Sequence, residues 1–192
     1  MRIILASGSP RRADLLRAAG FDFERVVTDV DESIRAGESP KAYVRRLAAE
    51  KSRAALAALD VEGPIVLGAD TTVVVDGEIL GKPVDDADAA AMLRRLSGRR
   101  HEVMTGVSVR QGASEVGRVE VTGVHFAPLT DADVAWYVAS GEGRDKAGAY
   151  AIQGLASRFI PRIEGSYSNV VGLPVTCVYE LITEISSTRR DR

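Results

Sequence analysis

Apolar residues recur along the chain with two spacings, and together they predict strands that alternate with helices. Continuous or alternating apolar runs bounded by Gly, Pro, Asn or Asp are typical of strands. The longest such run ends at Asp76-Gly77, a dipeptide typical of a tight hairpin turn. A second hairpin is expected further along the chain. The expected strands lie at 2–6, 21–28, 65–75, 78–80, 100–110, 116–127 and 158–163.

Helical spacing of apolar residues, with capping residues in front, predicts five helices between these strands. Ser9-Pro10 and Ser39-Pro40 each place a capping serine before a proline at the first helical position. Helices and hairpins in this order imply an α/β protein with a long mixed sheet rather than a purely parallel one. The expected helices cover 10–19, 40–59, 86–97, 131–140 and a final segment that begins at Pro174; the tail after Ser186 is expected to fray.

The first strand runs directly into Ser7-Gly8-Ser9-Pro10-Arg11-Arg12. A helix N-terminus attracts anions through its unpaired N–H groups and its dipole. Two arginines in that first turn oppose the dipole, but they suit the site if a phosphate is bound there. The alternative is an ordinary strand–turn–helix start with two surface arginines.

Asp70 is the sharpest anomaly in the chain, because it interrupts a run that otherwise predicts a buried strand. An isolated buried carboxylate is costly unless it is paired, bound to a metal or protonated. Gly68 and Ala69 leave room for a ligand or for another backbone segment. The structural alternative is an aspartate that ends one strand and hydrogen-bonds the next turn.

The lysines are few, four against 21 arginines, and so their positions are informative. Lys51 falls on the apolar face of the helix expected at 40–59. It either covers the edge of the core with its stem or points its ammonium at an anion. Lys82, in Gly81-Lys82-Pro83, lies in a rigid loop where it can serve the same purpose.

Three acidic residues between predicted elements, Asp29, Asp31 and Glu32, suit a hard cation such as Mg²⁺, although such a patch is more often a solvated loop. His101 and His125 have no partner at metal-ligand spacing, and we assign neither a role. A nucleophile elbow, a Walker A loop and a dinucleotide-binding glycine motif are absent from the sequence.

Composition excludes several classes of protein. The 192 residues are 45% hydrophobic and 27% charged with a net charge of −2, which is typical of a globular protein and gives no basic field for nucleic acid. Cys177 lies in an apolar stretch and is expected in the core. Neither a signal segment nor a membrane-spanning stretch is recognisable, so a cytoplasmic protein is expected.

The ordered set of motifs resembles the Maf family of nucleoside triphosphate pyrophosphatases, over residues 1 to about 185. Any one motif is weak, whereas the whole set in family order is specific. The matching segments are 7–12, 50–51, 68–71, 81–83, 105–106, 145–154 and 165–174.

This resemblance implies a single 1–192 domain of the Maf and inosine-triphosphatase type, with two lobes around a nucleotide cleft. It implies hydrolysis of a nucleoside triphosphate to the monophosphate and pyrophosphate with Mg²⁺ or Mn²⁺ as cofactor. Asp70 matches the general base and a metal ligand, and Glu32 matches a second metal ligand. The remaining matches are Lys51 and Lys82 as catalytic cations, and Ser7, Ser9, Arg11, Arg12, Thr71, Lys146 and Gln153 as substrate-binding residues.

The sequence from Asp145 to Gly154 is similar to that of the subgroup that acts on dTTP and UTP. The same resemblance leaves alternatives open. One is a nucleotide-binding regulator of cell division without significant turnover, and another is an enzyme for damaged purine triphosphates. A homodimer is also compatible with the family, and a nucleic-acid partner is not expected.

Overall fold

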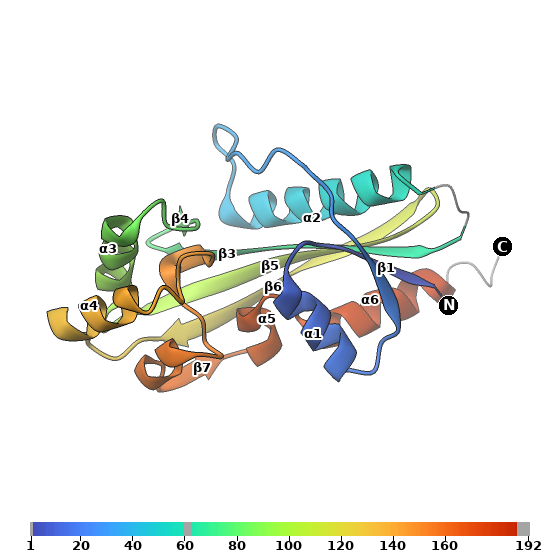
Figure 1. Ribbon diagram of the computed structural model, residues 1–192. Helices are drawn as coiled ribbons and strands as arrows, with labels where there is room; N and C mark the ends of the chain where they lie inside the picture. The colour runs from blue at the N-terminus through green and yellow to red at the C-terminus, as the bar shows by residue number, and fades with distance from the viewer. Residues whose placement is uncertain (1, 60–62, 188–192) are drawn as a thin grey trace. The chain divides into compact units, whose positions relative to one another are not determined.

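The computed structural model describes residues 2–59 and 63–187, in which strands and helices alternate (Figure 1). The seven strands are β1 Ile3–Ala6, β2 Phe23–Val26, β3 Ile65–Val75, β4 Glu78–Leu80, β5 Arg100–Gln111, β6 Ser114–His125 and β7 Arg162–Glu164. The helices are α1 Pro10–Ala18, α2 Pro40–Ala57, α3 Asp86–Leu96, α4 Asp131–Ala139, α5 Tyr167–Val171 and α6 Val175–Ser187, with short 3₁₀ turns at Ala147–Ala149 and Leu155–Phe159.

The described residues form two compact units. The first unit contains the residues up to Asp70, Thr105–Glu120 and those from Gly172 onward. The second contains Thr71–Met104 and Val121–Val171. The boundary falls within β3, β5 and β6. The nucleotide cleft and the description of 1–192 as one domain stay predictions.

The strands form one mixed sheet in the order β2-β1-β3-β5-β6-β7, with β4 paired to β3. Strand β1 is parallel to both β2 and β3. Strand β4 is antiparallel to β3, and β7 is antiparallel to β6. The α/β fold with a long mixed sheet is therefore confirmed. The register pairs Ala6 with Gly68, so the turn that starts at Ser7 begins beside the stretch of β3 that leads to Asp70.

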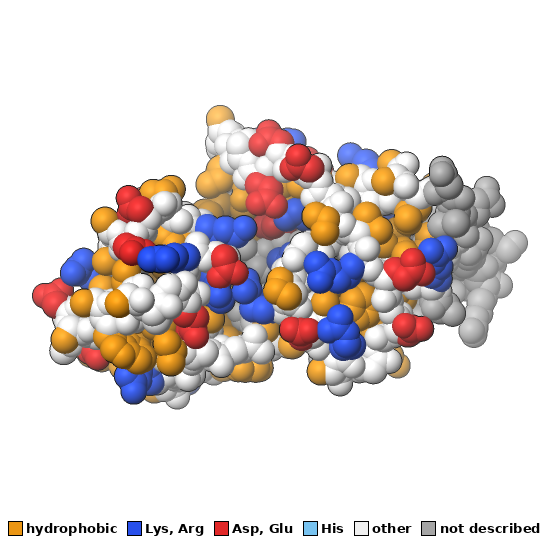
Figure 2. All heavy atoms as spheres, viewed as in Figure 1, with side chains coloured by type: hydrophobic (Ala, Val, Ile, Leu, Met, Phe, Trp, Pro, Cys, Tyr) orange, Lys and Arg blue, Asp and Glu red, His pale blue; other side chains and the backbone are white. Residues whose placement is uncertain are grey.

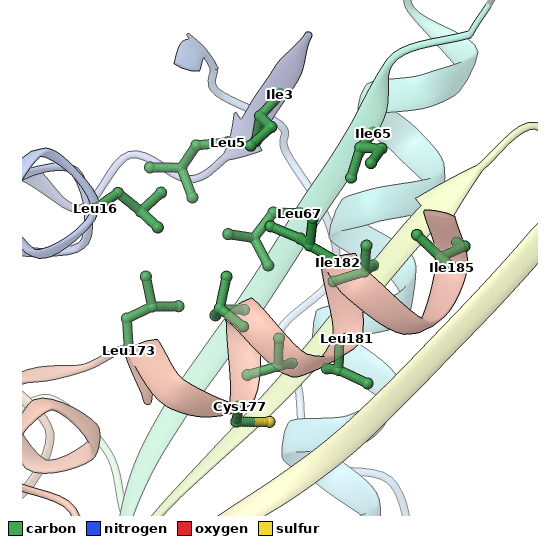
Figure 3. Packing of buried hydrophobic residues seen from close by; sticks show 14 of the residues in the cluster. Ile3, Leu5, Leu16, Ile65, Leu67, Leu173, Cys177, Leu181, Ile182 and Ile185 are labelled. Atoms are coloured by element: carbon green, nitrogen blue, oxygen red, sulfur yellow. The ribbon is translucent and has the colours of Figure 1, made fainter. Parts of the chain in front are cut away.

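The core of the first unit lies where α1 and α6 cover one face of β1 and β3 (Figure 3). Leu5, Leu16 and Leu67 are fully buried there, and each buried leucine contributes roughly 2 kcal/mol. Cys177 lies in this core, as the sequence predicts. Ile4, which precedes Leu5 in β1, packs in a separate cluster on the opposite face, so both faces of the strand are buried and its four residues are all apolar.

Helix α2 approaches the sheet so closely that two strand positions must be glycine. A Cβ on Gly68 of β3 would lie 2.2 Å from the Ala48 carbonyl oxygen, and one on Gly106 of β5 would lie 2.1 Å from that of Val44. Of the two interpretations of Gly68, the structure therefore supports the approach of a backbone segment. This close packing also brings Lys51 of α2 next to β3.

The second unit departs from the sequence prediction near its end. Residues 155–159 form a 3₁₀ turn rather than the start of a strand, and β7 covers only Arg162–Glu164. Pro161 has no N–H for a sheet ladder, and Phe159 turns inward to contact the rings of Trp136 and Tyr137. The short helix α5 was not predicted either. The final residues of the expected frayed tail, 188–192, lie outside the described residues.

Candidate active site

Asp70 ends the part of β3 that belongs to the first unit, and it is paired as a buried carboxylate must be. Its Oδ1 lies 2.7 Å from Nζ of Lys51, and only 8% of the residue is exposed. Burial raises the pKa of Asp70, while the positive charges of Lys51 and Arg12 oppose that shift. A charged pair inside the fold, rather than a hydrogen bond that ends a strand, accounts for this residue.

Lys51 comes from the apolar face of α2, as its spacing predicts, and is 9% exposed. Its ammonium does not reach out to solvent along the edge of the core. It also lies 2.6 Å from Oε1 of Glu32, so one cation bridges two carboxylates from different segments. Glu32 is the outer member of this trio, with about half of its side chain exposed.

Arg12 is buried, which excludes the interpretation of a surface arginine. Its Nε donates to the Gly172 carbonyl at 2.8 Å, and its Nη1 donates to Ser7 Oγ at 3.1 Å and to the Ala69 carbonyl at 2.8 Å. Burial lowers the pKa of Arg12, and the charge of Asp70 opposes that shift. The guanidinium therefore ties the first turn, β3 and the segment before α6 together beside Asp70.

Ser9 occupies the N-cap position of α1, but its side chain makes no capping hydrogen bond. Its backbone N–H donates instead to Ser7 Oγ at 3.2 Å. The capping serine predicted from the sequence is thus correct in position and wrong in mechanism. Arg11 is partly buried in the first turn of the same helix.

The acidic patch does not act as one group. Oδ1 of Asp31 accepts the N–H of Ser33 at 2.9 Å, a local turn contact, while Glu32 reaches Lys51. Among residues 2–59 and 63–187, no three His, Cys, Asp or Glu side chains gather as a metal site. Asp70 and Glu32 nevertheless both turn a carboxylate oxygen toward the ammonium of Lys51. Such hard oxygen donors, together with phosphate oxygens of a substrate, fit Mg²⁺ or Mn²⁺.

The other predicted site residues belong to the second unit. Thr71 follows Asp70 on β3 and is partly buried, and Lys82 is exposed after β4. Nζ of Lys146 donates to the Glu142 carbonyl at 2.7 Å and lies 2.6 Å from Asp145 Oδ1. Gln153 is exposed in the glycine-rich segment. His101 and His125, which received no role, also lie in this unit.

Two organising groups were missed by sequence reasoning. Arg46 of α2 binds Glu38 through two hydrogen bonds, of 2.6 and 2.7 Å. In the second unit, Oε2 of Glu142 accepts the hydroxyl of Tyr137 at 2.7 Å. Only an i,i+4 spacing within α2, Arg46 to Glu50, could have indicated the first group. Glu38 precedes the helix, and nothing in its spacing marks it as the partner of Arg46.

A profile of the Maf family, described as Maf-like protein, matches residues 2–185 of the chain. This chain belongs to the Maf family. Proteins named dTTP/UTP pyrophosphatase from Shewanella oneidensis and Escherichia coli O157:H7 are 53% and 50% identical to it over 190 residues. These alignments cover 96% of this chain and 98% of the first relative, and 99% of this chain and 96% of the second.

A third relative of the same name, from Symbiobacterium thermophilum, is 51% identical over 183 residues, 95% of this chain and 93% of that protein. Among solved structures, a HAM1 protein from Coxiella burnetii shows a TM-score of 0.48 at 15% identity, covering 97% of this chain and 99% of that one. Membership of the Maf family rests on the profile and on the sequence relatives.

The distribution of surface charge agrees with the low net charge. On the face shown in Figure 2, Lys and Arg side chains are interspersed with those of Asp and Glu. Within the described residues, no helix is both long and apolar enough to span a membrane.

Proposed function

We propose that this Maf-family protein is an enzyme that hydrolyses dTTP and UTP to the monophosphate and pyrophosphate. Relatives that are 53% and 50% identical over nearly the whole chain are named dTTP/UTP pyrophosphatase. The observation that carries the proposal is the buried carboxylate of Asp70, held at 2.7 Å by Lys51. Buried charges of this kind, with a specific charged partner, are concentrated at active sites.

Asp70 is the proposed general base. Water attacks the α-phosphorus, a new bond forms between the water oxygen and phosphorus, and the bond to the oxygen that bridges the α- and β-phosphorus breaks. The proton of the water passes to the Asp70 carboxylate, and pyrophosphate leaves with the bridging oxygen. Burial raises the pKa of Asp70, which makes its carboxylate a better proton acceptor than an exposed one.

The cations of the first unit are proposed to stabilise the negative charge of the triphosphate. Lys51 supplies a compact ammonium, and Arg11 lies in the first turn of α1 with Ser7 and Ser9 just before it. Arg12 contributes its charge, while its hydrogen bonds to Ser7, Ala69 and Gly172 hold the surrounding segments in place. Charges that are fixed in advance are the most effective in stabilising a transition state.

We propose that Asp70 and Glu32 hold the divalent cation, Mg²⁺ or Mn²⁺. When bound, the metal would offset phosphate charge and acidify a water molecule. The two carboxylates already share one cation, the ammonium of Lys51, at 2.7 and 2.6 Å. Few protein carboxylates are needed, because Mg²⁺ commonly completes its shell with substrate phosphates and water.

In the second unit, Lys82 is proposed to stabilise the leaving group and Lys146 to bind substrate. Thr71 and Gln153 are proposed to set the choice of nucleotide. The support is the match of each residue to a Maf-family motif. The amide of Gln153 can donate and accept hydrogen bonds at once, which suits the edge of a pyrimidine. A cytoplasmic location and a possible homodimer, with nucleotide rather than nucleic acid as partner, complete the proposal.

The test is release of pyrophosphate from dTTP, UTP, CTP, 7-methyl-GTP, dITP and ATP, each with and without Mg²⁺ or Mn²⁺. Metal-dependent release that is fastest with dTTP or UTP is the expected result. Fastest release from a damaged purine triphosphate would keep the reaction and change the substrate. Tight nucleotide binding without turnover would instead favour the regulator of cell division.

A further inference from the structure

The segment that carries Glu32 has no regular secondary structure, and side chains of α2 hold it in place. Three successive carbonyls accept hydrogen bonds from that helix. Arg46 Nη1 donates to Asp31 O at 3.5 Å, the hydroxyl of Tyr43 donates to Glu32 O at 3.0 Å, and Arg46 Nη2 donates to Ser33 O at 2.9 Å. The backbone of Glu32 is thus fixed at its own carbonyl and on both sides.

Arg46 is itself fixed by two carboxylates. Its Nε and Nη2 bind the two oxygens of Glu38 at 2.6 and 2.7 Å, and its Nη1 lies 3.2 Å from Oε2 of Glu50. The side chains of Arg46 and Glu38 are only 12% and 9% exposed. Hydrogen bonding to Arg46 lowers the pKa of Glu38 to about 2, so the pair stays charged at neutral pH. Bidentate and shielded pairs of this kind are the ones that fix geometry.

The planar guanidinium is required for this arrangement. It serves both oxygens of Glu38 and two backbone carbonyls at once, and it also lies 5.6 Å from the centre of the Tyr43 ring. An ammonium has three donors on a single atom and cannot reach this set of acceptors. The side chain of Glu32, on the segment held in this way, places its Oε1 2.6 Å from Lys51 Nζ.

We propose that Arg46 is a positioning residue: it holds the segment 31–33 against α2 so that Glu32 meets Lys51 and Asp70, and it thereby sets the affinity of the site for a divalent cation. The inference rests on the proposed function, in which Glu32 and Asp70 are the protein ligands of the cation. Residues that orient a metal ligand commonly change metal affinity by about 10-fold to 100-fold when they are removed.

Binding of Mn²⁺ alone, followed by the electron paramagnetic resonance signal of the free ion, tests the proposal without turnover. Arg46→Met is expected to weaken Mn²⁺ binding about tenfold or more. The matched control is Arg53→Met, which removes the same charge from an exposed position of the same helix. The control is expected to bind within about twofold of the native protein.

Glu38→Gln provides a second way to loosen the segment, since it weakens the ion pair and leaves α2 intact. It is expected to change Mn²⁺ affinity in the same direction as Arg46→Met, and it keeps the test decisive if that variant folds poorly. Both variants are expected to speed amide hydrogen exchange in the segment 31–38, whereas Arg53→Met leaves exchange there unchanged.

A double-mutant cycle with Glu32→Gln separates positioning from a general loss of stability. If Arg46 acts through Glu32, Arg46→Met has little further effect once Glu32 no longer carries its charge. An equal loss in both backgrounds would overturn the proposal. So would affinities for Arg46→Met and Glu38→Gln that match Arg53→Met, or an absence of Mn²⁺ binding by the native protein.

If Glu32→Gln alone abolishes measurable Mn²⁺ binding, Glu32 is confirmed as a ligand. The comparison of Arg46→Met and Glu38→Gln with Arg53→Met then decides whether Arg46 positions it. Pyrophosphate release by the same preparations reports on the proposed function separately. If the native protein releases pyrophosphate but Arg46→Met binds Mn²⁺ as tightly as the native protein, the proposed function stands. The positioning role of Arg46 is then wrong.

Discussion

Nζ of Lys51 lies 2.7 Å from Oδ1 of Asp70, in a pair whose two side chains are each 11% exposed. The same ammonium is shared with Glu32. The buried lysine would therefore keep one carboxylate partner if Asp70 lost its charge. The two roles of Asp70, as a partner of Lys51 and as a base, can for this reason be separated by substitution.

Asp70→Asn is expected to fold and to lose about a hundredfold or more in turnover, the usual scale for a general base. The amide has nearly the same shape but cannot accept the proton. Steady-state release of pyrophosphate from dTTP measures the loss, and thermal unfolding checks the fold. Asp14→Asn is the control, since Asp14 is exposed on α1 and pairs with Arg17 in a contact worth little to stability. Turnover close to native in Asp70→Asn would remove it from the mechanism.

Gly68→Ala is expected to destabilise the protein by about 1–3 kcal/mol or more, because the added methyl group meets backbone rather than a flexible side chain. The new Cβ would lie 2.2 Å from Ala48 O and 2.7 Å from Ser52 N. Urea unfolding at neutral pH measures the change. In the matched variant Gly81→Ala, the Cβ meets nothing within 4 Å, so little change is expected. Equal stability of the two variants would contradict the close approach of α2.

His101 is expected to make the protein sensitive to acid. It is buried between the rings of Phe126 and Tyr150, its Nε2 lies 2.8 Å from the Tyr150 hydroxyl, and its Nδ1 has no hydrogen-bond partner among the described residues. Burial lowers the pKa of His101 from 6.5 to about 3. Between these two pH values, His101 is protonated in the unfolded chain and neutral in the folded protein. Stability falls as the pH drops from about 6.5 toward 3, with a slope of about 1.4 kcal/mol per pH unit for one proton.

The His101→Phe variant tests this expectation. It leaves the Tyr150 hydroxyl without its partner and so costs about 1–3 kcal/mol at neutral pH. Between pH about 6 and 4, however, its free energy of unfolding should fall less steeply than that of the native protein, by about one proton. His125→Gln serves as the control, because His125 is partly exposed beside Glu164. Parallel pH profiles for the native protein and His101→Phe would rule out His101 as the source.

Tyr137→Phe is expected to loosen the segment that carries Gln153. The Tyr137 hydroxyl donates to Glu142 Oε2 at 2.7 Å and accepts the N–H of Ala151 at 3.1 Å, while Glu142 Oε1 accepts the N–H of Leu155 at 2.9 Å. The backbone is thus held on both sides of Gln153. Loss of the hydroxyl should cost about 1–3 kcal/mol.

If Gln153 reads the base, Tyr137→Phe should also lower the ratio of kcat/KM for dTTP to that for CTP. The exposed Tyr179 offers the control Tyr179→Phe, which is expected to leave both stability and the ratio unchanged. A loss of stability with an unaltered ratio would argue against a role for this loop in nucleotide choice.

The sequence by itself determined the parts of this protein that depend on local periodicity. The β-branched run at 65–75 is β3 with the same bounds, and the helix that begins at Pro40 places Lys51 on its apolar face. Burial of an apolar stripe fixes both, so the two residues that pair in the site were each marked as anomalous before any contact was known. The seven motifs in family order were likewise present in the sequence alone.

Only the tertiary structure decided which partners those residues meet. Asp31 and Glu32 are neighbours in the sequence, but in the fold Glu32 reaches Lys51 while Asp31 accepts the N–H of Ser33. The residues around Arg12 left it open as a phosphate-binding or a surface arginine, and its contacts with Gly172 and Ala69 show that it is buried. The strand expected at 158–163 begins only at Arg162, since Phe159 packs against Trp136 of α4. Contacts between distant segments depend on the packing of the whole chain, which no local window of sequence contains.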